Sequence, residues 1–181
     1  MKNVLSLLLL SFSLSLSAQQ IARPADDILN DAYKEATAQH KNVLVIFHAS
    51  WCGWCHKMDN SINDVSCKNL FDKNYVIVHF TVEESDNNKA LENPGAVDLL
   101  VKCKAENAGL PYWLIINKSG DFLADSRVKT AATPSGSFGD NMGCPSTESQ
   151  VAAFIKILKQ TSTLSDSELE IIATRFKKNN S

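Results

Sequence analysis

The feature that most constrains this chain is a short β-branched run at residues 43–47, closely followed by two cysteines three positions apart. A continuous apolar run of this length is typical of a strand buried on both faces of a sheet. The two cysteines, Cys52 and Cys55, lie at the start of a predicted helix. Open α/β sheets place their active sites at the carboxyl ends of their strands, so this position marks both thiols as candidate functional groups.

The cysteine spacing is compatible with more than one chemistry. A thiol at a helix N-terminus is favoured as the thiolate, and a second thiol one helical turn away would complete a dithiol/disulfide switch. With His56 the motif also spells C-x-x-C-H, the attachment signal of a c-type haem, for which Met58 or Met142 could be the second axial ligand. No second pair of ligands has matching spacing, so no zinc or other metal site is predicted.

The first 18 residues are predicted to be a cleaved secretory signal peptide. One lysine precedes an uncharged, leucine-rich run, and small residues follow, with a cleavage point expected after Ser17 or Ala18. The run is shorter than the roughly 20 residues of a membrane span. We therefore expect an exported protein, periplasmic or secreted, with no permanent membrane span and a single domain over residues 19–181.

Composition narrows the function class. The chain is 44% hydrophobic and 21% charged, which are values typical of a globular protein. Its net charge of −2 gives no electrostatic reason to expect a nucleic-acid partner.

Five cysteines fall in the predicted mature chain, and export would allow disulfides among them. An odd number leaves at least one thiol unpaired within the chain. Cys67 and Cys103 fall on predicted helices on either side of a strand, and they could pair or be buried separately. Cys144, in a glycine-rich segment, is the candidate for an unpaired or regulatory thiol.

The element order predicts a mixed sheet with helices on both faces, because a β-α-β half is followed by a β-β-α half. Capping-box patterns at Thr147–Gln150 and Ser165–Glu168 predict two terminal helices. In the middle helix, Val97, Leu100 and Val101 are expected to lie on one face. The other predicted elements are helices at 25–36, 56–62, 67–71 and 96–106, strands at 43–47, 75–82, 110–116 and 122–124, and loops at 83–93 and 127–145.

Three motifs placed within this order carry a family resemblance. They are Trp51-Cys52-Gly53-Trp54-Cys55, Asn93-Pro94-Gly95 and Gly109-Leu110-Pro111. Over nearly the whole mature chain the sequence resembles the thioredoxin superfamily, most of all its exported single-domain members with a W-C-G-W-C site. The resemblance implies an α/β thioredoxin-like fold, here with extra N-terminal and C-terminal helices. It also implies a protein disulfide oxidoreductase whose only redox group is its own disulfide, with no cofactor.

The resemblance also implies roles for individual residues. Cys52 would be the exposed attacking cysteine, and Cys55 would resolve the mixed disulfide. Pro111 would be a cis-proline beside the site, and Leu110 would offer its backbone to an extended substrate. The predicted substrate-binding residues are Trp51, Gly53, Trp54, Leu110 and Pro111.

The sequence departs from the family pattern at places that tune the thiols. Ile46 stands where thioredoxins commonly bury an aspartate, so the usual proton acceptor for the resolving thiol is missing. His56, Lys57 or Glu83 could substitute for it, and we treat His56 and Lys57 as candidate modulators. The 127–145 segment is also longer than the family usually has there.

The sequence therefore predicts exchange of protein disulfides through Cys52 and Cys55, with reductase activity favoured over oxidase or isomerase activity. The expected partners are disulfide-containing or dithiol proteins and an unidentified electron donor or acceptor. Two alternatives stay open, a c-type haem electron carrier and a non-catalytic binding module of the same fold.

Overall fold

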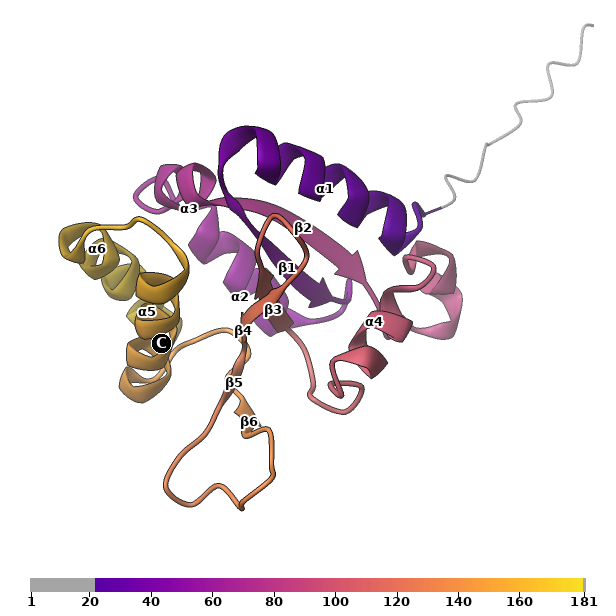
Figure 1. Ribbon diagram of the computed structural model, residues 1–181. Helices are drawn as coiled ribbons and strands as arrows, with labels where there is room; N and C mark the ends of the chain where they lie inside the picture. Colours follow the sequence, from indigo (N-terminus) through magenta and orange to yellow (C-terminus); the bar gives the residue numbers. More distant parts are fainter. Residues whose placement is uncertain (1–21, 181) are drawn as a thin grey trace, which may run out of the picture.

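The computed structural model describes residues 22–180, arranged around one mixed four-stranded sheet (Figure 1). Its strand order is β2–β1–β3–β4. The central strand β1 (Asn42–His48) pairs in parallel with β2 (Tyr75–Thr81) and antiparallel with β3 (Tyr112–Ile116). The edge strand β4 (Phe122–Asp125) pairs antiparallel with β3. Every residue of β1 between its two ends is buried, as the continuous apolar run predicts.

Helices cover both faces of this sheet (Figure 1). They are α1 (Ala25–Gln39), α2 (Gly53–Ile62), α3 (Lys68–Asn74), α4 (Ala96–Lys102), α5 (Glu148–Thr161) and α6 (Asp166–Lys177), with the 3-10 helices η1 (Asp86–Leu91) and η2 (Lys178–Asn180). Successive side chains of a strand point to opposite faces, so β1 contributes to two separate cores. Leu44 and Ile46 face α2, α3, α5 and α6, whereas Val43, Val45 and Phe47 face α1 and α4.

The predicted α/β architecture, with extra helices at both ends, is confirmed. Both terminal helices begin at complete capping boxes, with Thr147 and Ser165 as N-caps. The middle helix is shorter than predicted, because Lys104 adopts a left-handed conformation (φ 52°) that reverses the chain after α4. Of the three apolar residues expected on one face of this helix, Leu100 is buried, whereas Val97 and Val101 are exposed.

The predicted 127–145 loop contains a small two-stranded arm. Strands β5 (Arg127–Val128) and β6 (Asp140–Asn141) pair antiparallel, and the chain between them projects away from the sheet (Figure 1). Gly139 adopts φ 89°, and a Cβ atom there would overlap the backbone of Val128. The close approach of the two sides of the arm therefore requires glycine at this position.

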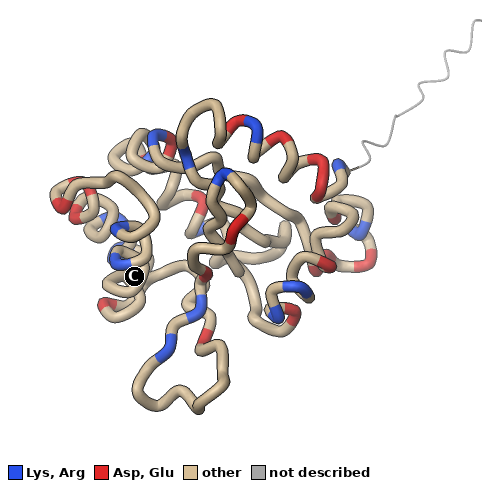
Figure 2. The backbone as a smooth tube through the Cα atoms, in the orientation of Figure 1, with Lys and Arg blue, Asp and Glu red and all other residues tan. Residues whose placement is uncertain are grey.

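Acidic and basic residues are interspersed over the backbone (Figure 2), as the balanced composition implies. Within the described part of the chain, no helix has the length and apolar character needed to cross a membrane. The predicted signal peptide lies outside the described residues.

Candidate active site

The two motif cysteines form a disulfide at the N-terminus of α2, just beyond the carboxyl end of β1. Cys52 is the N-cap residue of the helix, and its Sγ accepts the backbone N–H of Cys55 at 3.2 Å. Cys52 is 4% exposed and Cys55 is 1% exposed, with Ala49 and Leu110 packed against the pair. The expected exposure of Cys52 is therefore wrong for this oxidised state, in which neighbouring side chains cover both sulfurs.

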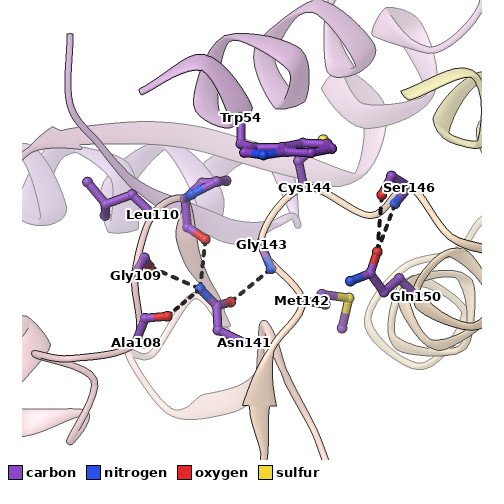
Figure 3. Close-up of a pocket in the computed structure, with 11 residues that line it drawn as sticks. Trp54, Ala108, Gly109, Leu110, Asn141, Met142, Gly143, Cys144, Ser146 and Gln150 are labelled. Carbon is purple, nitrogen blue, oxygen red and sulfur yellow. Dashed lines mark hydrogen bonds between the residues drawn. The ribbon is translucent and has the colours of Figure 1, made fainter. Parts of the chain in front are cut away.

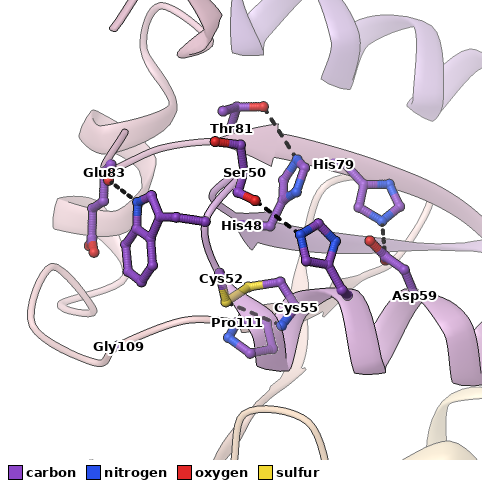
Figure 4. The surroundings of a disulfide bond; sticks show 12 residues. His48, Ser50, Cys52, Cys55, Asp59, His79, Thr81, Glu83, Gly109 and Pro111 are labelled. Carbon is purple, nitrogen blue, oxygen red and sulfur yellow. Dashed lines mark hydrogen bonds and ion pairs between the residues drawn. A yellow bond between two sulfur atoms is a disulfide. The ribbon is translucent and has the colours of Figure 1, made fainter. Parts of the chain in front are cut away.

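Pro111 lies beside the disulfide (Figure 4). The Leu110–Pro111 peptide bond is cis, as the resemblance implies. Leu110 is partly buried against the cysteine pair. Because Pro111 directly precedes β3, which pairs with β1, the sheet brings together the proline and the cysteines from distant parts of the sequence.

Trp51 and Trp54 flank the disulfide as large exposed aromatic side chains, 60% and 48% exposed. The indole Nε1 of Trp51 donates to the backbone carbonyl of Glu83 at 2.8 Å. The amine of Lys57 lies 4.7 Å from the centroid of the Trp54 ring, and it donates to the carbonyl of Asn179 at 3.0 Å. Lys57 therefore positions Trp54 and contacts the C-terminal 3-10 helix.

A buried carboxylate that the sequence analysis did not single out holds the start of the cysteine loop. Glu84 accepts the backbone N–H of Ser50 at 2.5 Å and the Ser50 hydroxyl at 2.7 Å. Its neighbour Glu83 is exposed, has φ 54°, and reaches the site only through its backbone carbonyl. Nothing in the two adjacent sequence letters distinguishes the buried residue from the exposed one.

His48, His79 and Asp59 lie on the other side of the cysteine loop (Figure 4). A third histidine, His56, contacts the start of that loop. His79 Nε2 lies 2.8 Å from Asp59 Oδ1 on α2, and the His48 and His79 rings are 5.4 Å apart. Burial lowers the pKa of His48, and the nearby His79 lowers it further, so His48 is neutral near pH 7. His56 Nε2 lies 3.0 Å from the carbonyl of Ser50.

The other three cysteines are unpaired. Cys67 belongs to the core on the α2 side of the sheet and Cys103 packs on the opposite side, so they do not meet. Burial raises the pKa of all three thiols, that of Cys144 to about 12. Cys144 also accepts a hydrogen bond from the Asn179 amide at 3.3 Å.

A hollow of about 290 Å³ opens beside Trp54 and Pro111. Figure 3 shows the residues that line it. It is lined by Trp54, the 108–111 loop, the 141–144 stretch, Ser146 and Gln150. The amide of Asn141 donates to the carbonyls of Ala108, Gly109 and Pro111 at 3.0, 3.0 and 3.1 Å. The arm is thereby joined to the cis-proline loop. Sequence reasoning marked the 127–145 segment only by its length and missed this connection.

The sulfur-containing residues named for the haem alternative have other contacts in this structure. The sulfurs of Cys52 and Cys55 are bonded to each other. Met58 is fully buried in the core, and Met142 lines the hollow. Across residues 22–180, no three His, Cys, Asp or Glu side chains are grouped so that they could hold a metal ion.

Comparison with known proteins identifies the family. A model of the family described as thioredoxin-like matches residues 25–117, slightly more than half of the chain. No curated protein matches the sequence. Among solved structures, a disulphide isomerase from Xylella fastidiosa Temecula1 is 19% identical, with 87% of this chain and 92% of that chain covered and a TM-score of 0.49. A thioredoxin from Thermus thermophilus is also 19% identical, with 77% and 86% covered and a TM-score of 0.45. The chain belongs to the thioredoxin-like family, and its fold and cysteine pair are those of a thiol-disulfide oxidoreductase.

Proposed function

We propose that the protein is an exported enzyme that reduces disulfides in polypeptide substrates through Cys52 and Cys55. The observation that carries the proposal is the disulfide at the N-terminus of α2, placed beside Pro111 at the carboxyl end of β1. The exposed indoles of Trp51 and Trp54 provide apolar surface on which a polypeptide could lie. Export is proposed from the N-terminal sequence pattern.

The reaction begins from the reduced pair. The first turn of α2 favours the Cys52 thiolate, and the N–H of Cys55 already points at that sulfur. The thiolate attacks one sulfur of the substrate disulfide, a Cys52–substrate bond forms, and the other substrate sulfur leaves as a thiolate with the electron pair. Cys55 then attacks Cys52, releases the second substrate thiolate and closes the Cys52–Cys55 bond. A dithiol donor must supply two electrons before the next cycle.

The proton acceptor for Cys55 cannot be residue 46, because Ile46 is an apolar side chain buried in the core. Of the substitutes suggested by the sequence, Lys57 contacts Trp54 and Asn179, and the Glu83 side chain is exposed. His56 remains a candidate modulator, and the His48, Asp59 and His79 group joins it.

Insulin reduction with dithiothreitol as electron donor tests the proposal. Wild-type protein should accelerate precipitation of the insulin B chain, and Cys52→Ser should abolish the acceleration. Cys103→Ser is the matched control, because that unpaired thiol packs on the opposite face of the sheet, and it should keep wild-type activity. Equal rates for wild type and Cys52→Ser would instead indicate a non-catalytic binding module.

Equilibration with glutathione tests the direction of the reaction. A reduction potential of about −270 mV, as in thioredoxin, would support a reductase. A potential near about −120 mV would contradict that direction and indicate an oxidase.

A further inference from the structure

We infer that the hollow beside Trp54 and Pro111 binds an uncharged side chain of the substrate, at a position next to the cysteine that Cys52 attacks. The inference rests on the proposed function and adds a substrate preference to it. The hollow is continuous with the proposed substrate surface, because Trp54, Leu110 and Pro111 are shared by both. A volume of about 290 Å³ lies at the lower end of the range for ligand pockets, which suits one side chain better than a cofactor.

The far wall of the hollow comes from residues beyond the family match, which ends at residue 117. Asn141 fastens this wall with its three amide hydrogen bonds to the 108–111 loop, and its Oδ1 accepts the N–H of Gly143 at 3.0 Å. The indole of Trp113 donates to the carbonyl of Gly143 at 2.9 Å from the core side. The hollow is therefore held open before a substrate arrives, which lowers the entropy cost of binding.

None of the residues that line the hollow is charged. Trp54, Leu110, Pro111 and Met142 supply apolar surface. A charged substrate side chain would lose hydration there without gaining an opposite charge, whereas an apolar or amide side chain would not bear that cost. The nearest cation on α2, that of Lys57, is already engaged by the Trp54 ring and the carbonyl of Asn179.

Gln150 provides a polar group at the end of the hollow. Its Oε1 accepts the N–H groups of Ser146 and Thr147 and the Ser146 hydroxyl, all at 3.2–3.3 Å. The amide nitrogen therefore points the other way (Figure 3). Among residues 22–180 no hydrogen-bond acceptor for that nitrogen is found. A substrate carbonyl entering the hollow would accept a hydrogen bond from this nitrogen. Glutamine therefore fits both the apolar walls and this polar end, whereas methionine fits the apolar walls without placing a charge there.

A set of short peptides tests this preference. Each carries one cysteine joined by a disulfide to thionitrobenzoate, and the flanking residues are Gln, Met, Asp or Lys in turn. Reduced protein forms a bond to the peptide sulfur, and thionitrobenzoate leaves as a coloured thiolate, so the second-order rate constant is read directly. Dithiobis(nitrobenzoate), which has no peptide, reports the intrinsic reactivity of the dithiol.

The wild-type protein should react with Gln and Met peptides at least about fivefold faster than with Asp and Lys peptides, which corresponds to about 1 kcal/mol. Gln150→Glu keeps the capping box, since glutamate serves equally at that position, and it turns one carboxylate oxygen toward the hollow. This variant should raise the rate with the Lys peptide at least about fivefold relative to the Gln peptide. Ser149→Glu adds the same charge to the same turn but does not line the hollow, so it should leave the order unchanged.

Each other outcome has a distinct meaning. Equal rates for all peptides would overturn the inference while leaving the proposed function intact. A fastest Asp peptide would also overturn it, because Lys57 rather than the neutral lining would then select the substrate. If Ser149→Glu raised the rate with the Lys peptide relative to the Gln peptide as much as Gln150→Glu does, the effect would be one of general charge and not of a subsite. If the reduced protein did not react even with dithiobis(nitrobenzoate), that result would contradict both the proposed function and the inference.

Discussion

Replacing Glu84 by alanine tests whether the buried carboxylate holds the cysteine loop. The substitution removes two hydrogen bonds, at 2.5 and 2.7 Å, from the N–H and the hydroxyl of Ser50. Hydrogen bonds to a charged group contribute about 1.5–3 kcal/mol each. Ser50 itself is exposed, so water replaces part of what is lost. Removing a buried charge also relieves a desolvation cost. We therefore expect a net loss of about 2 kcal/mol in the free energy of unfolding.

Urea denaturation measures this loss. With a slope of about 2 kcal/mol/M, typical of a domain of this kind, the midpoint should fall by about 1 M. Glu83→Ala is the control, because it removes the adjacent exposed carboxylate and keeps the carbonyl that Trp51 uses. That control should stay within about 0.5 kcal/mol of wild type.

Glu84→Ala should leave the reduction potential of the Cys52–Cys55 pair nearly unchanged. Neither Glu84 bond reaches a cysteine sulfur, so the oxidised and reduced forms should lose the same stability. An unequal loss would appear as a potential shift of about 30 mV for every 1.4 kcal/mol of difference. A loss of stability in Glu84→Ala no larger than in Glu83→Ala would contradict this role of Glu84. A shift of the reduction potential above about 30 mV would contradict it too.

Two further predictions concern titratable groups. Because burial holds the pKa of His48 below its ordinary value of about 6.5, the unfolded chain binds a proton that the folded chain does not, and stability should fall as the pH drops below about 6.5. His48→Gln should flatten that part of the stability–pH curve measured by urea denaturation, and an unaltered slope would contradict the assignment. Cys67 and Cys144, both buried and with raised pKa, should resist iodoacetamide in the folded oxidised protein. Mass spectrometry should find three carbamidomethyl groups after unfolding without reductant, and rapid labelling of Cys144 in the folded protein would argue against its burial.

Much of the fold follows from local sequence signals. Two kinds of signal affect only residues a few positions away in the sequence, so their structural effect can be predicted directly. They are the continuous apolar run of β1 and the capping residues Thr147 and Ser165. The length of α4 and the burial of its side chains depend on tertiary context. Val97 and Val101 match a helical stripe, yet the helix turns Ala96 and Leu100 to the core.

The site was less accessible to prediction, because its polar contacts join distant positions. Glu84 reaches across 34 residues to Ser50, and Asn141 reaches across about 30 to the carbonyl of Pro111. Neither residue lies in a recognisable motif. The fate of Cys67 and Cys103 likewise depends on which side of the sheet each helix packs, and spacing alone does not encode that.

The pairing of β1 with β3 has a consequence for how the site moves. Phe47 lies opposite Tyr112 in that ladder. The strand that ends before the disulfide and the strand that follows Pro111 are therefore paired directly in one sheet. Tyr112 and Trp113 anchor β3 into opposite cores, and each side chain is tied at its polar tip, to Asp125 and to Gly143. These contacts oppose rotation of β3 about its own axis. The disulfide and Pro111 are therefore held in one relative position by the sheet. A substrate must adapt its own backbone to both of them during exchange.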